Sequence, residues 1–452
     1  MGTAIGGGSS STLGGGNANV SISGGQVIAK SGSGAGIGGG SSRTNGGETE
    51  SIYNGGTATI NISGDPIIRT GSIGGGITKD LRGKIGSAII NISGGDIQAQ
   101  FVMAAGAVTM PAFTMSDGTI RNSYADDKEY VHIQEKGGAV YLEDGTFTMT
   151  GGTIKNCSAV QGGAVYIDSS KGNSTFTMSG GEIHSCFATG KDQTKGHGGA
   201  VYLNGGQVLM TGGKIWNNYS VNGDGGAVYI SNGNFFMQNG SPTISGNSAQ
   251  KGNGGGVFVS SAGSEVQVNL LRGLITDNSA NNYGGGVCVD MGAASHAASV
   301  IVGEAGAENN TTPDISGNTA MLSGGGLYVR GLKANITIDG GNIKGNQVSA
   351  YVKNENVANE GGEVTLNAEH VTDFVTVTFD GNGGTIAGAE TYQQKVVINT
   401  NSKLTQNQFI NGGKNFVRWN NRPDNLGDIS YDNGAKINIS KDITLYAIWK
   451  DQ

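Results

Sequence analysis

The chain has 452 residues and a formal net charge of −7, with 84 Gly but only 5 Pro. This composition excludes a collagen-like chain, which needs a strict three-residue glycine period and far more Pro. The lack of a dense Lys/Arg cluster argues against nucleic acid as a partner, and the lack of a long apolar run argues against a membrane span.

The first residues, Met1–Ser10, lack the basic and apolar segments of a secretion signal. The repeat pattern is already under way at Ala4–Gly8, so we expect the natural signal to lie upstream. The 3 Cys in so long a chain form no disulfide framework.

Residues 1–112 alternate short aliphatic strands with glycine turns. Asn19–Gly25, Ile60–Gly64 and Ile90–Gly95 share one pattern, in which Ile or Val alternates with Asn or Ser before Gly. This pattern predicts about three thin coils with aliphatic filling. Residues 96–112 are expected to be the transition to larger coils.

A Gly-Gly-Ala-Val-Tyr motif and looser copies of it recur through the middle of the chain every 25 to 40 residues. The copies begin at Gly137, Gly162, Gly198, Gly225, Gly254, Gly284 and Gly324. A second motif of the Phe-Thr-Met type and a third motif centred on Ile lie between successive copies. Each repeat is therefore expected to hold three short strands, none of them with helical periodicity.

Three short strands in roughly 30 residues, at variable spacing, are typical of a parallel β-helix whose insertions loop out of the turns. A propeller blade needs four strands in about 40–50 residues, and a leucine-rich repeat needs its own consensus. Neither fits. The sequence therefore predicts an all-β fold, a right-handed parallel β-helix solenoid of about eleven coils. A single coil buries too little apolar surface to offset its ordering entropy, so the coils must stack.

Alternation assigns the faces, because side chains at i and i+2 share one face of a strand. The aliphatic pair after each Gly-Gly-Ala, such as Val140 and Leu142, is expected in the core with the Phe, Met and Ile of the other motifs. A further ladder follows three residues after each core Ile: Ser123, Cys157, Cys186, Asn218, Asn247, Asn278, Asn318 and Asn346. Stacked Asn amides can bond to neighbouring rungs. The two Cys are expected to fill ladder positions as thiols, and a disulfide between them stays open.

A different pattern starts near residue 374. It opens with Val375–Thr385, continues through Phe416–Asn420 and closes with Asp442–Trp449. Over residues 374–450 the pattern closely resembles the Listeria–Bacteroides repeat, a small β-grasp-like module of bacterial surface proteins. The resemblance implies a spacer or anchoring-side module in an adhesin-like protein, without a catalytic role.

The middle repeats are similar to those of chlamydial polymorphic outer-membrane proteins, which combine a Gly-Gly-Ala-aliphatic motif with a Phe-x-x-Asn motif. Here Ile takes the Phe position, as in Ile244–Asn247. This resemblance covers residues 113–346. Similar Gly-rich coils occur in pectin-lyase-like surface proteins, so it implies the fold more than a particular partner.

Two groups of side chains are candidate binding sites. If the aliphatic residues of the first strand face inward, an aromatic column faces outward: Tyr141, Tyr166, Tyr202, Tyr229, Phe258 and Tyr328. Such a column can stack on sugars or anchor a protein partner, or its rings can simply pack on one another. The second candidate is a polar-aromatic patch of Trp216, His184 and Glu182, with Lys155 and Lys214 beside it.

Catalysis is the less favoured reading. Glycoside hydrolysis needs two carboxylates about 5–10 Å apart. Glu182 and His184 form the best acid–base pair, yet no second carboxylate aligns with Glu182 in the neighbouring repeats. The sequence holds no spacing typical of a metal or cofactor site.

The sequence thus predicts three parts: Gly-rich N-terminal coils over 1–112, the main β-helix over 113–373, and the Listeria–Bacteroides-type module over 374–452. The expected function is that of a secreted or cell-surface, cell-wall-associated adhesin that binds a glycan or host protein along the lateral face. The expected state is a monomer that is not an enzyme. A passive surface stalk and a polysaccharide-active enzyme are the alternatives.

Overall fold

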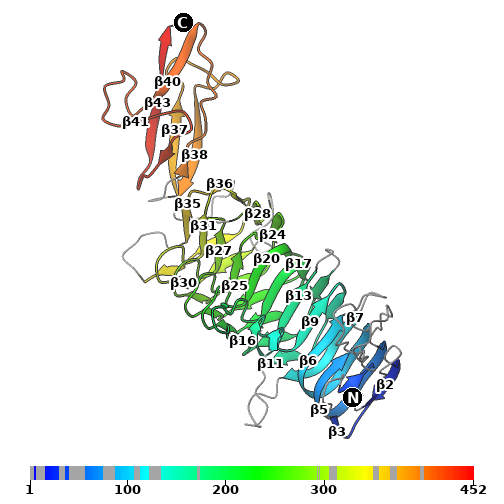
Figure 1. Ribbon diagram of the computed structural model, residues 1–452. Helices are drawn as coiled ribbons and strands as arrows, with labels where there is room; N and C mark the ends of the chain where they lie inside the picture. The colour runs from blue at the N-terminus through cyan, green and yellow to red at the C-terminus, as the bar shows by residue number, and fades with distance from the viewer. Residues whose placement is uncertain are drawn as a thin grey trace, which may run out of the picture.

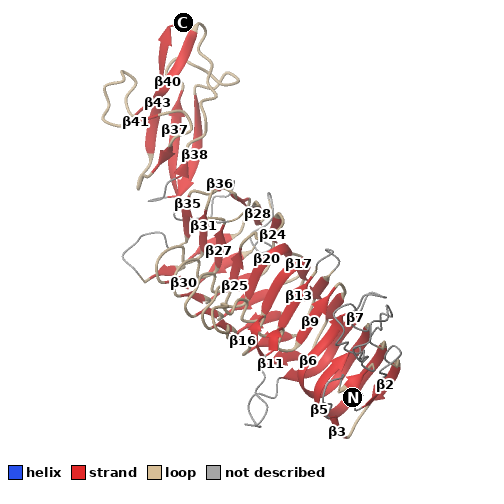
Figure 2. Cartoon of the chain, in the orientation of Figure 1, coloured by secondary structure: helices blue, strands red, loops and turns tan. Residues whose placement is uncertain are grey.

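The computed structural model describes residues 5–6, 16–29, 36–39, 56–74, 87–105, 112–121, 134–169, 174–292, 294, 296–304, 313–349, 356–366, 374–397 and 402–451. The described residues form strands, turns and loops, without a helix among them (Figure 2). Figure 1 shows an elongated solenoid that starts at the N-terminal end and carries a small separate sheet at its C-terminal end.

A complete coil has four strand segments, numbered here first to fourth in chain order. The first segments, which follow the Gly-Gly turns, are β1 (Ile5–Gly6), β4 (Ile37–Gly38), β9 (Val140–Glu143), β13 (Val165–Asp168), β23 (Val257–Val259), β27 (Val287–Asp290), β31 (Leu327–Arg330) and β35 (Val357–Glu360). The second segments are β2 (Ala18–Ile22), β10 (Thr146–Met149), β14 (Thr175–Met178), β24 (Val266–Leu270), β28 (Ala298–Val302), β32 (Ala334–Ile338) and β36 (Glu363–Leu366).

The third segments carry the core Ile of each coil, and the fourth segments are the shortest. The third segments are β3 (Gln26–Ala29), β11 (Thr153–Lys155), β15 (Glu182–His184), β18 (Lys214–Trp216), β21 (Thr243–Ser245), β25 (Leu274–Thr276), β29 (Asp314–Ser316) and β33 (Asn342–Lys344). The fourth segments are β8 (Gln134–Lys136), β12 (Ser158–Gln161), β16 (Phe187–Ala188), β19 (Tyr219–Ser220), β22 (Ser248–Ala249), β26 (Ser279–Ala280), β30 (Thr319–Ala320) and β34 (Gln347–Val348). Strands that run through more than one segment are β5 (Ala58–Gly74), β6 (Ala88–Ala105), β7 (Ala112–Arg121), β17 (Val201–Met210) and β20 (Val228–Met237).

Among the described residues, the strands of successive coils pair in parallel, and their register shifts only at irregularities in the β5–β6, β6–β7 and β17–β20 pairs. The first segments alone form one unbroken column of Cα partners: Ile5, Ile37, Ile73, Val102, Val140, Val165, Val201, Val228, Val257, Val287, Leu327 and Val357. The prediction of a parallel β-helix is confirmed. Its right-handed sense is the one expected for parallel crossover connections.

The N-terminal and main coils form one continuous solenoid. Strand β6 pairs with both β7 and β9 across the transition, and a single hydrophobic core runs from Val20 to Val357. Position 112 therefore marks a change of filling, from Ile90 and Ile92 to the larger Phe113 and Met115. The predicted core residues of all three motifs are buried in this cluster.

The prediction of three strands per repeat is wrong for the complete coils, which have four. The third motif bends at its centre, where Asn156 takes a φ of 53°, and this splits it into β11 and β12. The fourth segments form a separate eight-stranded sheet. They were hidden in the sequence because strands of two to four residues are too short to show alternation.

The predicted Asn ladder occupies this bend and is confirmed. Asn247 Nδ2 donates to Asn278 Oδ1 at 2.9 Å and to the Ile215 carbonyl of the preceding coil at 3.1 Å. The same amide-to-amide contact recurs up the ladder, and its last acceptor is Asn356 Oδ1. Of the predicted ladder residues, Ser123 lies outside the described residues.

Cys157 and Cys186 fill two ladder positions as buried free thiols. Cys186 Sγ takes the place of an amide oxygen and accepts from the Cys157 N–H at 3.4 Å. Side chains at equal positions of adjacent rungs are about 4.7–4.9 Å apart, whereas a disulfide needs a Cβ–Cβ distance of about 3.5–4.5 Å. The ladder geometry therefore keeps these two thiols unbonded.

The C-terminal module is a mixed sheet with its own core. Its strands are β37 (Phe374–Asp380), β38 (Thr391–Val397), β39 (Ser402–Lys403), β40 (Lys414–Asn420), β41 (Ser430–Tyr431), β42 (Lys436–Ile437) and β43 (Ile443–Asp451). The sheet order is β38-β37-β43-β40-β41, with β39 and β42 as a separate pair. The first and last long strands, β37 and β43, pair in parallel, as expected of a β-grasp-like module.

Candidate functional site

The third segments present two outward columns on one lateral face of the solenoid. In β15 and β18 the inward Ile183 and Ile215 are fully buried, so the residues on either side of each Ile point outward. The register places Glu182 opposite Lys214 and His184 opposite Trp216. Equal positions in successive coils thus bring together the polar-aromatic patch that the sequence predicted.

Trp216 is the centre of this patch. Its indole Nε1 donates to Glu182 Oε2 at 3.1 Å, and its ring stacks on the His184 imidazole with centroids 4.5 Å apart and planes 22° apart. The Lys214 ammonium lies 5.0 Å from the Trp216 centroid. Glu182 is exposed, while His184 and Trp216 are half-buried. The patch is therefore ordered by its own contacts and still open to solvent.

Burial favours the neutral form of His184. Partial burial lowers the pKa of the imidazole, the nearby Lys155 ammonium lowers it further, and the Glu182 carboxylate opposes both effects. The His184 Nδ1 lies 3.1 Å from the Ser185 hydroxyl. At neutral pH the patch thus offers hydrogen-bonding groups together with one carboxylate.

A second aromatic pair, not predicted from the sequence, lies just across the ladder turn. Phe187 of β16 and Tyr219 of β19 are in register and stack with centroids 5.0 Å apart and planes 3° apart. Both rings are half-buried. The signal for this pair was present, since each ring follows a ladder residue directly, at the position that holds Ser in most neighbouring coils.

Both stacks end at the same coil boundary. The next coil places Ser245 in register with Trp216, and Ser248 in register with Tyr219. Among the described residues, the ring contacts of Trp216 are with His184 and Lys214. We call this feature the aromatic step. It consists of the last ring of each stack, Trp216 and Tyr219, and of the short side chains Ser245 and Ser248 in the next coil.

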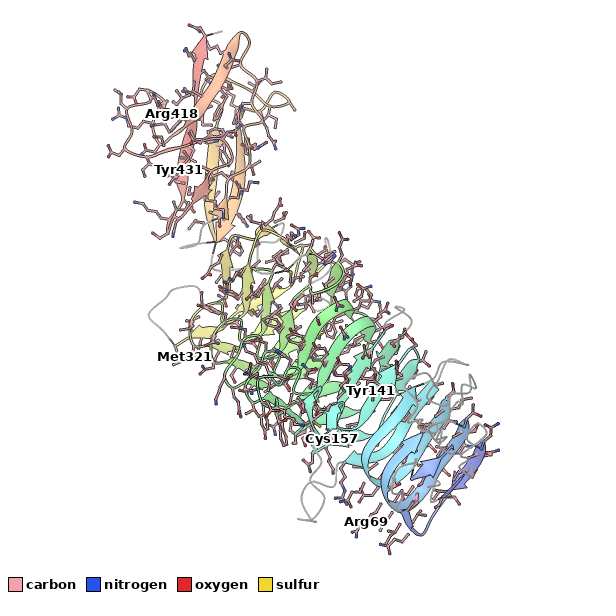
Figure 3. All side chains as sticks on the ribbon, in the orientation of Figure 1. Arg69, Tyr141, Cys157, Met321, Arg418 and Tyr431 are labelled. Carbon is pink, nitrogen blue, oxygen red and sulfur yellow. The ribbon has the colours of Figure 1, made fainter. Side chains whose placement is uncertain are left out.

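The predicted tyrosine column forms, but its exposure was predicted wrongly. Residues at this position are in register along the first segments. Four of the six predicted members are only 1% to 9% exposed: Tyr166, Tyr202, Phe258 and Tyr328. Tyr141, which is labelled in Figure 3, and Tyr229 are half-buried. The rings pack on one another, as in the Tyr166–Tyr202 stack at 4.7 Å.

The column is covered because the chain folds back over it at each Gly-Gly turn. Residues just before these turns reach the rings: the Lys136 ammonium lies 4.7 Å from the Tyr166 centroid, and His197 lies 4.2 Å from that of Tyr229. A Cβ on Gly254, which has a φ of +65°, would lie 2.8 Å from the Phe258 Cβ. Glycine is therefore what lets this corner close tightly.

His197 is fixed in the same corner. Its Nδ1 accepts from the Asp224 N–H at 3.1 Å, and the Asp224 carboxylate lies 3.5 Å away. Burial lowers the pKa of His197 and the Lys195 charge lowers it further, while the Asp224 charge opposes them. This contact stabilises the corner and leaves the ring little accessible to a ligand.

The chemistry of hydrolysis is not assembled around Glu182. Its partners in register are Thr153 and Lys214, so the positions paired with Glu182 do not supply the second carboxylate of a glycosidase. Within the described residues, no group of three His, Cys, Asp or Glu side chains could hold a metal ion. The same residues contain no helix able to cross a membrane.

The C-terminal module joins its first and last strands through one turn. Asn382 Nδ2 donates to the Ala447 carbonyl at 3.0 Å, and Trp449 Nε1 donates to the Gly381 carbonyl at 2.8 Å. A Cβ on Gly384 would lie 2.6 Å from the Trp449 ring. The Asp-Gly-Asn-Gly-Gly turn and the terminal Trp therefore depend on each other.

Residues 376–448 match the family model of the Listeria–Bacteroides repeat domain. Comparison with curated proteins and with solved structures found no match for the chain. Listeria–Bacteroides repeat domains are typical of extracellular bacterial surface proteins. The predicted resemblance of the C-terminal module is thus confirmed, and the two signature stretches of the Listeria–Bacteroides repeat module are the two that meet at Asn382 and Trp449.

Proposed function

We propose that this chain is a bacterial surface protein that binds a glycan on the lateral face of its β-helix, at the aromatic step, in the manner of an adhesin. The observation that carries the proposal is the ordered and half-exposed Trp216. Its ring stacks on His184, has the Lys214 ammonium 5.0 Å from its centroid, and is in register with the short Ser245 of the next coil. Large rigid aromatic side chains are the usual anchors of a binding surface.

The arrangement suits a sugar ring. The stacking distance between His184 and Trp216 is 4.5 Å, close to the spacing of adjacent strands, so the Trp216 plane faces along the solenoid axis. A pyranose placed over Ser245 would lay its C–H face on the indole. The Ser245 hydroxyl and the Glu182 carboxylate, which reaches the Trp216 indole, would then be available to bond its hydroxyls.

The setting supports this proposal. The Listeria–Bacteroides repeat module supports a cell-wall-associated or secreted protein. The resemblance of residues 113–346 to the repeats of chlamydial polymorphic outer-membrane proteins supports a β-helix of the kind found in surface proteins. Of the sequence-predicted binding residues, Trp216, His184 and Glu182 form the proposed site. Tyr141, Tyr166, Tyr202 and Tyr229 line the covered corner and are not included in it.

A glycan array with the full chain, followed by titration of the best oligosaccharide, tests the proposal. We expect Trp216→Ala to weaken binding by about 10- to 30-fold, the loss typical of an anchor residue. Phe236→Ala is the matched control, because Phe236 is also a half-buried outward aromatic residue but lies on the second segment. This control is expected to bind as the wild type does.

Three other outcomes would replace the proposal. Binding of a host protein but no glycan would assign the face to a protein partner. No binding at all would leave a passive stalk. Release of reducing ends from a bound glycan, measured alongside the array, would make the chain an enzyme.

A further inference from the structure

A cleft lies where the solenoid meets the Listeria–Bacteroides repeat module. It has a volume of about 570 Å³. One wall is the β35–β36 turn of the last coil, with Asn359 and Glu363, and the other wall is formed by β38 and residues 402–408. Clefts between structural units are common ligand sites.

The two walls are held by contacts. Phe374, the first residue of β37, packs against the solenoid core and also lines the cleft. The Gln394 side chain bonds the Lys403 carbonyl and the Thr405 N–H, both at 2.8 Å. The Asn359 side chain closes the β35–β36 turn through both polar groups of Gly362. The shape of the cleft is therefore set before any ligand enters.

The cleft is locally basic in a chain of net charge −7. Lys395 and Lys403 line it, and Glu363 is the one acidic residue among the described residues of the lining. Lys403 pairs directly across β39 and β42 with Lys436. The Lys436 ammonium reaches the last coil, where a Cβ on Gly361 would lie 3.4 Å from it.

Like charges directly opposite each other destabilise a strand pair. Within the described part of the chain, none of these three lysines forms an ion pair with a carboxylate. All three are exposed. The pair of Lys403 and Lys436 thus lacks a compensating charge and would be stabilised by a bound anion.

The rest of the lining is hydrophilic. The side chains of Gln393, Gln406 and Gln408 are exposed along the cleft, and each amide can both donate and accept hydrogen bonds. This lining fits a hydroxyl-rich molecule better than an apolar one.

We propose that this junction cleft binds a segment of an anionic polysaccharide, with its phosphate or carboxylate groups between Lys395, Lys403 and Lys436 and its hydroxyls on the glutamine amides. The site is separate from the aromatic step and does not depend on the function proposed there. It would bring the C-terminal end of the molecule to a negatively charged polymer while the lateral face stays accessible.

Calorimetric titration of the full chain with three oligomers tests this site. The probes are a poly(glycerol phosphate) oligomer, an oligogalacturonate and a neutral dextran oligomer. We expect at least one anionic probe to bind and the dextran not to bind. Binding is expected to weaken as salt is raised from about 50 to about 200 mM. A comparison of the affinities for the two anionic probes shows whether the cleft prefers phosphate or carboxylate groups.

The variant Lys403→Gln/Lys436→Gln is expected to weaken the binding by about 10-fold or more, or about 1.4 kcal/mol, without lowering the melting temperature. Lys414→Gln is the matched control, since Lys414 is in the same module but lies 3.9 Å from Asp451. Trp216→Ala is expected to leave this binding unchanged, which separates the two sites. If the double variant fails to fold, Lys395→Gln alone carries the test. Binding of neither anionic probe, or an equal loss in Lys414→Gln, would overturn the proposal.

Discussion

The Nδ2 of Asn218 donates to the Oδ1 of Asn247 in the next coil at 3.0 Å, while the Oδ1 of Asn218 accepts from the backbone N–H of Cys186 at 2.9 Å. Each ladder amide thus satisfies groups in the coils on both sides. Towards the N-terminus the ladder passes into Cys186 and Cys157, whose sulfurs make longer and weaker contacts with the same groups.

Extending the ladder is therefore expected to stabilise the protein. In Cys157→Asn/Cys186→Asn, the new amide at position 186 can accept from the residue 157 N–H and donate to the Ile154 carbonyl, now 4.0 Å from Cys186 Sγ. We expect the free energy of unfolding to rise by about 1–2 kcal/mol, since each added hydrogen bond contributes about 0.5–1.5 kcal/mol. Urea denaturation measures it.

Cys288→Asn is the control for this prediction. Cys288 is also fully buried, but it lies in the first-segment column between Phe258 and Tyr328. There an amide gains no ladder partner, so we expect a loss of about 1–3 kcal/mol. A loss of stability in the double ladder variant would contradict the account given for the two thiols.

The Gly-Gly corner makes a prediction about two glycines with the same backbone conformation. Gly254 has a φ of +65° and Gly345 a φ of +63°. A Cβ on Gly345 meets nothing within 4 Å, whereas one on Gly254 would lie 2.6 Å from the Val257 carbonyl oxygen. Gly345→Ala is expected to cost only the left-handed strain of about 1–2 kcal/mol.

Gly254→Ala is expected to cost about 1–3 kcal/mol more than Gly345→Ala, because its methyl group also clashes with the packed corner. The same substitution in the same conformation isolates the packing effect. Thermal denaturation of both variants provides the comparison, and equal losses would show that the corner is looser than the structure indicates.

Stability is expected to fall on mild acidification because of His197. Its pKa in the folded protein lies below the value of about 6.5 for an unfolded chain. The unfolded state therefore binds more protons between these two pKa values, and the free energy of unfolding decreases as pH falls through that window. Protonation of Nδ1 would also remove the hydrogen bond that Nδ1 now accepts from the Asp224 N–H.

His197→Gln tests this assignment, because glutamine does not titrate. Denaturant midpoints measured near pH 7.5 and pH 5.5 are expected to differ less in the variant than in the wild type. His184, whose pKa is also lowered, accounts for part of the remaining difference. An unchanged pH slope in His197→Gln would exclude His197 as its source.

The aromatic step can be filled from within the protein. Ser245→Trp would place an indole beside Trp216, where it extends the stack and adds about 0.5–1.5 kcal/mol of ring–ring attraction. We expect glycan binding to fall by about 10-fold or more because the sugar position is taken, while the protein remains at least as stable as the wild type.

Ser316→Trp is the control, because Ser316 occupies the same outward column two coils beyond Ser245. It introduces the same side chain away from the step and is expected to leave binding intact. Undiminished glycan binding by Ser245→Trp would show that the ligand does not use the open side of Trp216.

The core and the polar-aromatic patch were predictable because each depends on equal positions in successive repeats. Alternation placed Val140 and Leu142 inside, and the alignment of repeats brought His184 and Trp216 together. These relations need only local strand geometry and register. The Asn ladder could be predicted for the same reason.

The burial of the tyrosine column could not be predicted from strand alternation and the alignment of repeats. Whether Tyr166 is covered depends on Lys136, which comes from the turn before the preceding coil and folds back over the column. That contact follows from the angle at the Gly-Gly corner, which no residue pattern encodes. The junction cleft escaped prediction likewise, because its lysines come from two structural units with no shared period.

The unbroken first-segment column, from Ile5 to Val357, has a consequence for how the number of repeats can evolve. Each coil contacts mainly the coil before it and the coil after it, so the interfaces are interchangeable units. Duplication of one repeat between the aromatic step and the C-terminal module would move them about 4.8 Å farther apart, and loss of one would bring them closer by the same distance. Neither change would disturb the step or the module. The distance between the binding face and the C-terminal module can therefore evolve by changes in repeat number, independently of the ligand that is bound.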